Sequence, residues 1–225
     1  MATVVSLGGK RKSPSLEPLL ALCTDDMGRV DREIVARMRS PVALIPELAN
    51  HLVGAGGKRM RPLLTVAGAR LCGYSEDTDR HIKLATCVEF IHSATLLHDD
   101  VVDVSALRRG KPTANTVYGD KASVLVGDFL FTRAFELMVE VGSLDILGVL
   151  SSASSTIAEG EVLQLVSQRD ISTPESTYLE IIKAKTAKLF AAAAEEGAMV
   201  AGRNGPERVG LQSFGMNLGI AFQLV

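Results

Sequence analysis

The sequence has no tryptophan, 4% aromatic residues and three cysteines. The cysteines, Cys23, Cys72 and Cys87, are odd in number and have no CxxC spacing, which argues against a disulfide framework. We therefore expect reduced core thiols in a cytoplasmic protein. Because aromatic residues are scarce, most apolar contacts fall to Leu, Ala, Val and Ile, and this composition suits helix-on-helix packing.

Long apolar runs are also absent. No segment approaches the roughly 20 uninterrupted apolar residues of a membrane span, and the run at 124–131 is broken by Gly127 and Asp128. The first residues hold no long apolar stretch, so we expect no secretory signal. A net charge of −2 is not that of a general nucleic-acid binder, and a hydrophobic content of 47% excludes a disordered chain.

What the sequence does contain is helical spacing of apolar residues along most of its length. We predict one all-α domain over 1–225, with a loose segment at about 1–15 and a loop without β-strands at 106–121. The glycine and proline positions bound about eight helices. We place them at 16–38, 43–53, 58–72, 79–103, 122–141, 144–168, 174–201 and 206–225.

Three carboxylates, Asp99, Asp100 and Asp103, end one of these helices. Asp99 and Asp103 are i and i+4, so they project from one face and repel each other. A hard divalent cation would offset that repulsion, since Mg²⁺ is usually held by one or two carboxylates and substrate phosphates. Arg108 and Arg109 follow at once, and guanidinium groups match phosphate oxygens. The alternative is a solvated acidic helix end followed by a basic turn.

A second cluster of cations lies at 56–62, where a glycine pair precedes Lys58, Arg59 and Arg61. Glycines allow close backbone approach, and a helix N-terminus attracts anions. Lys58 and Arg61 are i and i+3 and should share a face. Cations at a helix start are electrostatically unfavourable, so a basic start favours function over chance.

Single polar residues on apolar helices complete the candidate site. His92 lies two turns before Asp99 and is either a phosphate donor or a satisfied core histidine. Lys185 and Thr186 stand in an Ala-rich helix and need partners if buried. Glu161 and Gln164 on another helix could line a polar cavity, and Gln223 lies near the end of the sequence.

Taken together, these residues resemble the trans-isoprenyl diphosphate synthases, the polyprenyl synthetase family. Several independent motifs occur in the family's order, which is far more specific than one acidic motif. They are the stretches at 57–62, 96–103, 108–113, 126–129, 160–164, 185–187 and 222–223.

The resemblance implies an all-α bundle around a deep central cavity and a Mg²⁺-dependent prenyltransferase. Such an enzyme condenses isopentenyl diphosphate with an allylic diphosphate. It also implies roles: Asp99 and Asp103 for Mg²⁺; Arg108 and Lys185 for the allylic diphosphate; Lys58, Arg61, His92 and Arg109 for isopentenyl diphosphate; Thr186 and Gln223 for the developing allylic cation.

Product length in this family depends on side chains just before the first aspartate motif. Ala94 and Thr95 are small there, so we predict a long-chain all-trans polyprenyl diphosphate of the kind used for quinone side chains. The resemblance further implies a homodimer. Peripheral membrane contact for product release remains open, and no nucleic-acid partner is expected.

The family normally carries a second aspartate-rich motif after its Phe-Gln element, here Phe222 and Gln223. The sequence ends at Val225. We therefore expect a chain truncated before that motif, with C-terminal helices missing and activity impaired in the piece alone.

Three other functions stay open. One is a non-catalytic partner subunit of a heteromeric prenyl synthase, although such a subunit would be expected to lose the aspartates or cations kept here. Another is an HD-type metal phosphohydrolase, with His98 as a ligand and His51 or His81 nearby. The last is a helical scaffold without chemistry, which the paired aspartates and Lys185 argue against.

Overall fold

The structure is a computed structural model that describes residues 15–54, 57–75, 78–168 and 170–225. Almost all of the described chain is helical, so the predicted all-α fold is confirmed. Nearly all of the segment expected to be loose, residues 1–14, and Gly56 of the glycine pair lie outside the described residues. Within the described part, no helix is long and apolar enough to cross a membrane.

The helices fall close to the predicted positions. They are α1 (Glu17–Arg37), α2 (Leu44–Gly54), α3 (Met60–Leu71), α4 (Arg80–Val102), α5 (Ala114–Tyr118), α6 (Asp120–Val141), α7 (Leu144–Ser167), α8 (Glu175–Ile182), the π-helical turn η1 (Lys183–Ala187), α9 (Lys188–Val200) and α10 (Pro206–Leu224).

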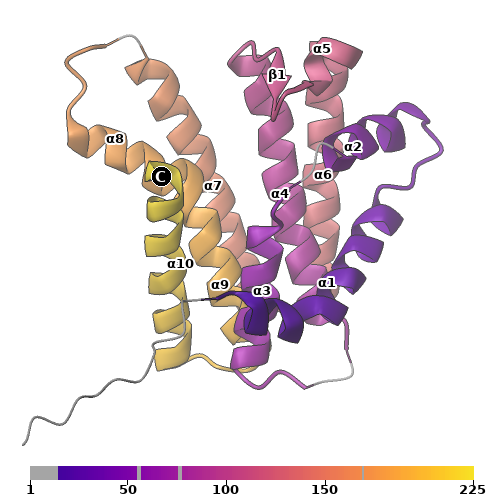
Figure 1. Cartoon of the computed structure of the whole chain (residues 1–225), viewed down its shortest axis with the longest axis vertical. Coiled ribbons are helices and arrows are strands. Elements are labelled where there is room, and N and C mark those ends of the chain that lie inside the picture. The colour runs from indigo at the N-terminus through magenta and orange to yellow at the C-terminus, as the bar shows by residue number, and fades with distance from the viewer. Residues whose placement is uncertain (1–14, 55–56, 76–77, 169) are drawn as a thin grey trace, which may run out of the picture.

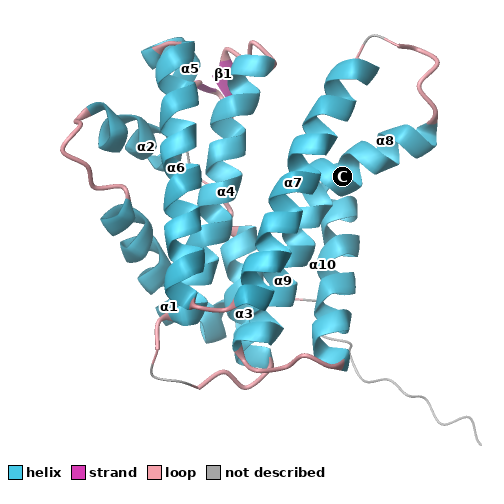
Figure 2. Ribbon diagram, turned by 180° about the vertical axis from the view of Figure 1, so that it is seen from behind, coloured by secondary structure: helices cyan, strands magenta, loops and turns pink. Residues whose placement is uncertain are grey.

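The core lies where α4 and α9 pass through the middle of the bundle. Every residue of α9 from Leu189 to Val200 is buried, and α4 contacts α1, α3, α6 and α9. On one side α6 runs beside α4, and on the other α10 packs on α9 (Figures 1 and 2). The buried cysteines Cys23, Cys72 and Cys87 are free thiols, as expected.

Glycines bring the helices around η1 unusually close together. A Cβ at Gly160 of α7 would lie 2.7 Å from Cβ of Ala184, and one at Gly219 would lie 2.5 Å from Cα of Ala187. A Cβ at Gly215 would collide with the carbonyl of Phe190. These contacts hold α7 and α10 against η1, the turn that carries Lys185 and Thr186.

Three details differ from the predicted elements. Helix α3 begins at Met60 because Arg59 has φ 47°, a left-handed conformation that cannot continue a helix back to Lys58. Residues 106–121 are not simply a loop, since β1 (Leu107–Arg108) and β2 (Lys111–Pro112) form a hairpin before α5. The predicted helix at 174–201 is interrupted by η1, where i→i+5 bonding replaces the α-helical pattern.

Candidate functional site

A cavity of about 790 Å³ opens between the two sides of the bundle. Helices α3 and α4 and the β1–β2 hairpin line one side, and α7, η1, α9 and α10 line the other. Of the site residues predicted from sequence, the lining contains Lys58, Arg61, His92, Thr95, Asp99, Asp103, Arg108, Arg109, Lys185, Thr186 and Gln223.

Asp99 and Asp103 form the acidic part of the wall. Asp103 caps α4, and its backbone N–H donates to the Asp99 carbonyl at 2.8 Å, which keeps the two carboxylates one turn apart. Burial raises the pKa of Asp99, the charge of Asp103 raises it further, and Lys185 opposes both. Burial and the charge of Asp103 thus disfavour the ionised form of Asp99, and a cation in addition to Lys185 would stabilise it.

Lys185 bridges the cavity from the opposite wall. Its Nζ donates to Glu161 Oε2 at 2.6 Å and lies 3.3 Å from Asp99 Oδ2. Burial opposes charge on Lys185, but the hydrogen bond that it donates to Glu161 and the charge of Asp99 outweigh it, so the pKa of Lys185 is raised. Lys185 therefore carries a positive charge into the acidic cluster. The π-helical turn, a feature often found at functional sites, presents it there.

Glu161 is a site residue that the sequence indicated only weakly. It lines the cavity, whereas Gln164, one turn further along α7, is not among the lining residues. Burial raises the pKa of Glu161, and its buried Oε1 has no hydrogen-bond partner within the described residues. Two sequence signals pointed to it, the i and i+3 spacing with Gln164 on an apolar helix and its place in the family-like stretch 160–164, but neither assigned it a role.

The residues that could hold a metal are Asp99 and Asp103. In the described part of the chain, no group of three or more His, Cys, Asp or Glu side chains is placed to bind a metal ion. Two carboxylates and a strained charge fit a hard cation that takes its remaining ligands from phosphate oxygens and water.

The basic part of the wall starts at the N-terminus of α3. The left-handed Arg59 pairs with Glu89 and lies 3.6 Å from Asp31, so it fixes this turn. Lys58 precedes the helix, so it does not share a helical face with Arg61 as expected, although both line the cavity. The Arg61 guanidinium stacks 4.5 Å from the centroid of the Phe190 ring.

Burial leaves Arg61 charged and His92 neutral. It lowers the pKa of Arg61 to about 10, which still leaves this side chain charged at neutral pH. It lowers the pKa of His92 well below its usual range, and the neighbouring arginines, Arg61 first, lower it further. The imidazole of His92 is therefore neutral, and it can donate one hydrogen bond to an anion.

The β1–β2 hairpin supplies the remaining arginines. Its two turn residues, Arg109 and Gly110, have φ values of 53° and 76°, a left-handed pair that favours glycine or asparagine. A Cβ on Gly57 would lie 3.4 Å from Nη1 of Arg109, so the hairpin reaches across to the start of α3. Strained backbone of this kind gathers at functional sites.

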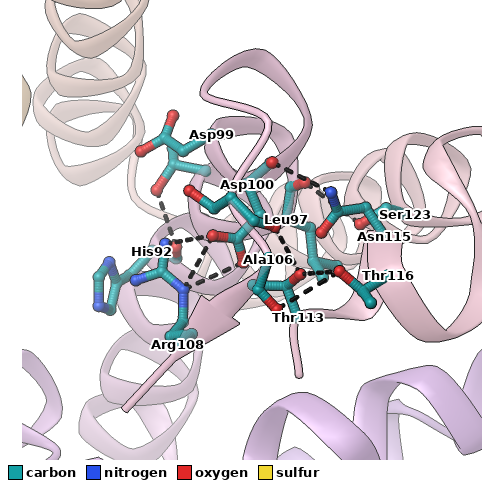
Figure 3. A network of polar contacts seen from close by, with 12 residues as sticks. His92, Leu97, Asp99, Asp100, Ala106, Arg108, Thr113, Asn115, Thr116 and Ser123 are labelled. Carbon is teal, nitrogen blue, oxygen red and sulfur yellow. Dashed lines mark hydrogen bonds and ion pairs between the residues drawn. The ribbon is translucent and has the colours of Figure 1, made fainter. Parts of the chain in front are cut away.

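Figure 3 shows how the hairpin is joined to α4. Arg108 Nε lies 3.0 and 3.2 Å from the two carboxylate oxygens of Asp100, and Nη2 lies 2.8 Å from Oδ1. Thr113 Oγ1 donates to the Ser105 carbonyl at 2.7 Å. Asp100 had no role of its own among the predictions from sequence, because its position inside an acidic motif concealed this contact.

Two pairs of residues predicted from the sequence differ in how the structure places them. Thr186 and Gln223 lie together, whereas only one of Ala94 and Thr95 lines the cavity. Thr186 Oγ1 donates to Gln223 Oε1 at 3.0 Å, so η1 and α10 place these side chains together. Thr95 lines the cavity, but Ala94 is fully buried in the core and is not among the lining residues. The role of both small residues in product length stays a prediction.

The phosphohydrolase alternative finds no support in the histidines. His98 contacts α6, 3.1 Å from the Val124 carbonyl, while His51 lies 2.9 Å from the Pro112 carbonyl. His81 lies beside Asp26, and 18 residues of helix separate it from Asp99, about 27 Å at the helical rise.

Comparison with known proteins agrees with this geometry. The model of the family described as polyprenyl synthetase matches residues 42–225. Octaprenyl diphosphate synthase of Escherichia coli is 49% identical over 211 residues, which are 94% of this chain and 65% of that protein. The all-trans-nonaprenyl-diphosphate synthase of Rhodobacter capsulatus is 45% identical, over 93% of this chain and 64% of its own length.

Solved structures give the same result. A polyprenyl synthase from Caulobacter crescentus, complexed with calcium and isoprenyl diphosphate, matches with a TM-score of 0.90 and 58% identity, over 95% of this chain and 65% of that one. A decaprenyl diphosphate synthase from Rhodobacter capsulatus matches with a TM-score of 0.89 and 50% identity, over 93% and 64%. The chain thus spans slightly less than two thirds of the length of these relatives. On this sequence, fold and cavity, the chain belongs to the polyprenyl synthetase family.

Proposed function

We propose that the protein is a prenyltransferase that condenses isopentenyl diphosphate with an allylic diphosphate to give an all-trans polyprenyl diphosphate. One observation carries this proposal: carboxylates and cations face each other across a single cavity. Asp99 and Asp103 lie in the same wall as Arg108, and Lys185 faces them from η1. A diphosphate with a divalent cation has the charges that this arrangement complements.

Asp99 and Asp103 would hold Mg²⁺, which supplies Lewis-acid stabilisation of the departing diphosphate. Arg108 and Lys185 bind the same diphosphate through their N–H groups, so negative charge that develops as the allylic C–O bond breaks meets fixed positive charge. Glu161 and Asp99 keep Lys185 at this position before the substrate arrives.

The second substrate suits the basic wall. Lys58, Arg61 and Arg109 bind the diphosphate of isopentenyl diphosphate, and neutral His92 adds a hydrogen-bond donor. Lys58 and Arg61 lie at the start of α3, whereas Arg109 lies in the hairpin, so residues from two elements bind one anion. The double bond of this substrate then attacks the allylic carbon from which the diphosphate has departed, and the resulting cation loses a proton to the released diphosphate to restore a double bond.

The uncharged part of the cavity suits the carbocation. The hydroxyl of Thr186 and the amide of Gln223 are hydrogen-bonded to each other and present oxygen dipoles rather than nucleophiles. Phe190 and Phe222 line the cavity nearby, with ring centroids 5.4 Å apart, and help to exclude water.

The proposed product is a long-chain polyprenyl diphosphate of the kind used for quinone side chains, because Ala94 and Thr95 are small. Ala94→Phe is expected to shorten the product, which chromatography of the dephosphorylated prenols would detect. Overpacking should also cost about 1–3 kcal/mol of stability, since Ala94 is fully buried. Unchanged product length in a folded variant would contradict this assignment.

We also propose a cytoplasmic homodimer, by likeness to the family, with membrane contact limited to product release. Sedimentation velocity would test the dimer. A non-catalytic partner subunit is the second candidate. Relatives include a protein named heptaprenyl diphosphate synthase component 2, from Geobacillus stearothermophilus, at 35% identity, and that name describes one component of an enzyme.

The decisive experiment incubates the full-length protein with labelled isopentenyl diphosphate, an allylic diphosphate and Mg²⁺. Chain-elongated product is the expected result. Phosphate release without condensation would indicate a hydrolase, and no reaction by the protein alone would indicate a partner subunit or a scaffold.

A further inference from the structure

Asp100 is the one carboxylate of the acidic motif that the mechanism above leaves without a role. It is 2% exposed, whereas Asp99 and Asp103 line the cavity. Successive residues of an α-helix point about 100° apart, so Asp100 cannot share the face on which Asp99 and Asp103 lie. Figure 3 shows Asp100 turned toward Arg108 and Asp99 turned away from it.

The contact between Asp100 and Arg108 is a two-pronged ion pair. Arg108 Nε donates to both oxygens, at 3.0 and 3.2 Å, and Nη2 donates to Oδ1 at 2.8 Å. This fork geometry fixes the plane of the guanidinium as well as its position. Both carboxylate oxygens of Asp100 accept from Arg108, and the side chain is buried and is not among the residues that line the cavity, so it does not face a metal ion held by Asp99 and Asp103.

The pair still leaves Arg108 able to bind a second anion. A guanidinium has five N–H donors, and the bonds to Asp100 engage only Nε and Nη2. The side chain of Arg108 is 31% exposed and lines the cavity. Asp100 thus holds one edge of the guanidinium while donors on Nη1 remain for a phosphate.

The backbone of Asp100 strengthens the same link. Its carbonyl accepts from the backbone N–H of Ser105 at 2.9 Å and from Nδ2 of Asn115 at 3.2 Å. The end of α4 is therefore tied through one residue to the segment before the hairpin and to α5. Arg108 is held in place from its backbone side and from its side chain.

We propose that Asp100 is a positioning residue, which aims Arg108 at the allylic diphosphate and does not bind the metal. This inference rests on the proposed prenyltransferase function. The three aspartates then have different roles, since Asp99 and Asp103 act on the metal, whereas Asp100 acts through Arg108.

The test is the kinetics of Asp100→Asn in the full-length protein. Loss of a side chain that orients a binding group typically costs about 10–100-fold in affinity or activity. We expect the KM for the allylic diphosphate to rise by that factor. The KM for isopentenyl diphosphate and the Mg²⁺ concentration for half-maximal rate should stay within about twofold. Asp145→Asn makes the same chemical change at an exposed site on α7 and serves as the matched control.

Two further measurements separate positioning from simple stabilisation. Arg108→Lys, which keeps the charge but loses the fork, should raise the same KM, and adding Asp100→Asn to it should have little further effect. If Asp100→Asn does not fold, Asp100→Glu, which keeps the charge but displaces the carboxylate from Arg108, should show the same selective rise. A rise in the Mg²⁺ requirement, or a lower melting temperature with unchanged KM values, would overturn the proposal.

Titration with Mg²⁺ and inorganic pyrophosphate covers the case in which the wild-type protein makes no elongated product. Absence of elongated product would contradict the proposed function, but binding of pyrophosphate would still test whether Asp100 positions Arg108. Asp100→Asn should then bind pyrophosphate about tenfold more weakly than Asp145→Asn. Equal binding by the two variants would overturn the role of Asp100.

Discussion

Two polar clusters in this bundle each bury a carboxylate between helices, and they differ in how its charge is met. The base cluster consists of Asp26, Arg29, Arg70 and His81 and joins α1, α3 and α4. The cavity cluster consists of Asp99, Asp103, Glu161 and Lys185 and joins α4, α7 and η1.

The base cluster satisfies its carboxylate. Arg70 Nε lies 2.7 Å from Asp26 Oδ2, and Arg29 and His81 each lie 3.3 Å from Oδ1. Burial would raise the pKa of Asp26, but the bond from Arg70 and the nearby His81 outweigh it, and the pKa is lowered. The carboxylate of Asp26 thus has its partners within the cluster, although the ring nitrogens of His81 make no hydrogen bond within the described residues.

In the cavity cluster, by contrast, the carboxylate charges are incompletely compensated. One ammonium, Lys185, serves carboxylates on two helices, and the pKa values of Asp99 and Glu161 are raised, first by burial. Raised carboxylate pKa values beside a cavity are common at functional sites. The two clusters therefore differ both in the direction of the carboxylate pKa shift and in position, since only the cavity cluster lines the cavity.

Asp99→Asn should disable the functional cluster with the largest effect. Removing a group that stabilises a developing charge lowers kcat by about 10²–10³-fold. Thermal stability should not fall, since a neutral amide relieves a buried and strained charge. Product formation and a thermal melt would measure both, and a large drop in melting temperature would contradict the assignment of this cluster to function.

Asp26→Asn should disrupt the structural cluster instead. The change removes the charge-assisted bond from Arg70, whose side chain is 32% exposed, and should cost about 1.5–3 kcal/mol. Urea unfolding would measure this loss, while the KM values of the folded variant should match wild type. If the variant were as stable as wild type, the base cluster would not contribute to the stability of the fold.

Arg109→Asn would refine the contrast by testing strain outside both clusters. Asn tolerates the left-handed conformation at φ 53° better than Ala, so Arg109→Asn should be about 1 kcal/mol more stable than Arg109→Ala, which loses the same side chain. The KM for isopentenyl diphosphate should rise at the same time because a cation is lost. Equal stability of Arg109→Asn and Arg109→Ala would show that the turn is not strained.

Glu196→Gln concerns another buried carboxylate, which lies in the core and pairs with neither cluster. Burial raises its pKa well above 4.5, and Glu195 adds to the rise, although Thr65 Oγ1 donates to it. The folded state therefore holds a proton that the unfolded state releases above pH 4.5, so stability falls as pH rises. The variant should show a smaller fall in melting temperature between pH 5 and 8 than wild type, and an equal fall would contradict the assignment.

Much of the fold could be predicted because apolar periodicity, glycines and prolines are local signals. The helix ends lie within a few residues of the predicted positions except where the backbone is unusual. Arg59 is left-handed, Lys183–Ala187 forms a π-helical turn, and Arg109 sits in a tight hairpin. Each exception falls beside the cavity, where tertiary contacts overrule local preference.

Residue type and spacing were enough to specify the helices and the motifs, and hence the chemical character of the candidate site. Which charge meets which depended on tertiary structure. The folded chain pairs Asp100 with Arg108, gives Lys185 to Glu161 and Asp99, and buries Ala94 away from the cavity lining. Most of these contacts join elements that are separate in the chain, and close approach at Gly160 and Gly219 sets the geometry around η1, so local sequence signals could not specify them.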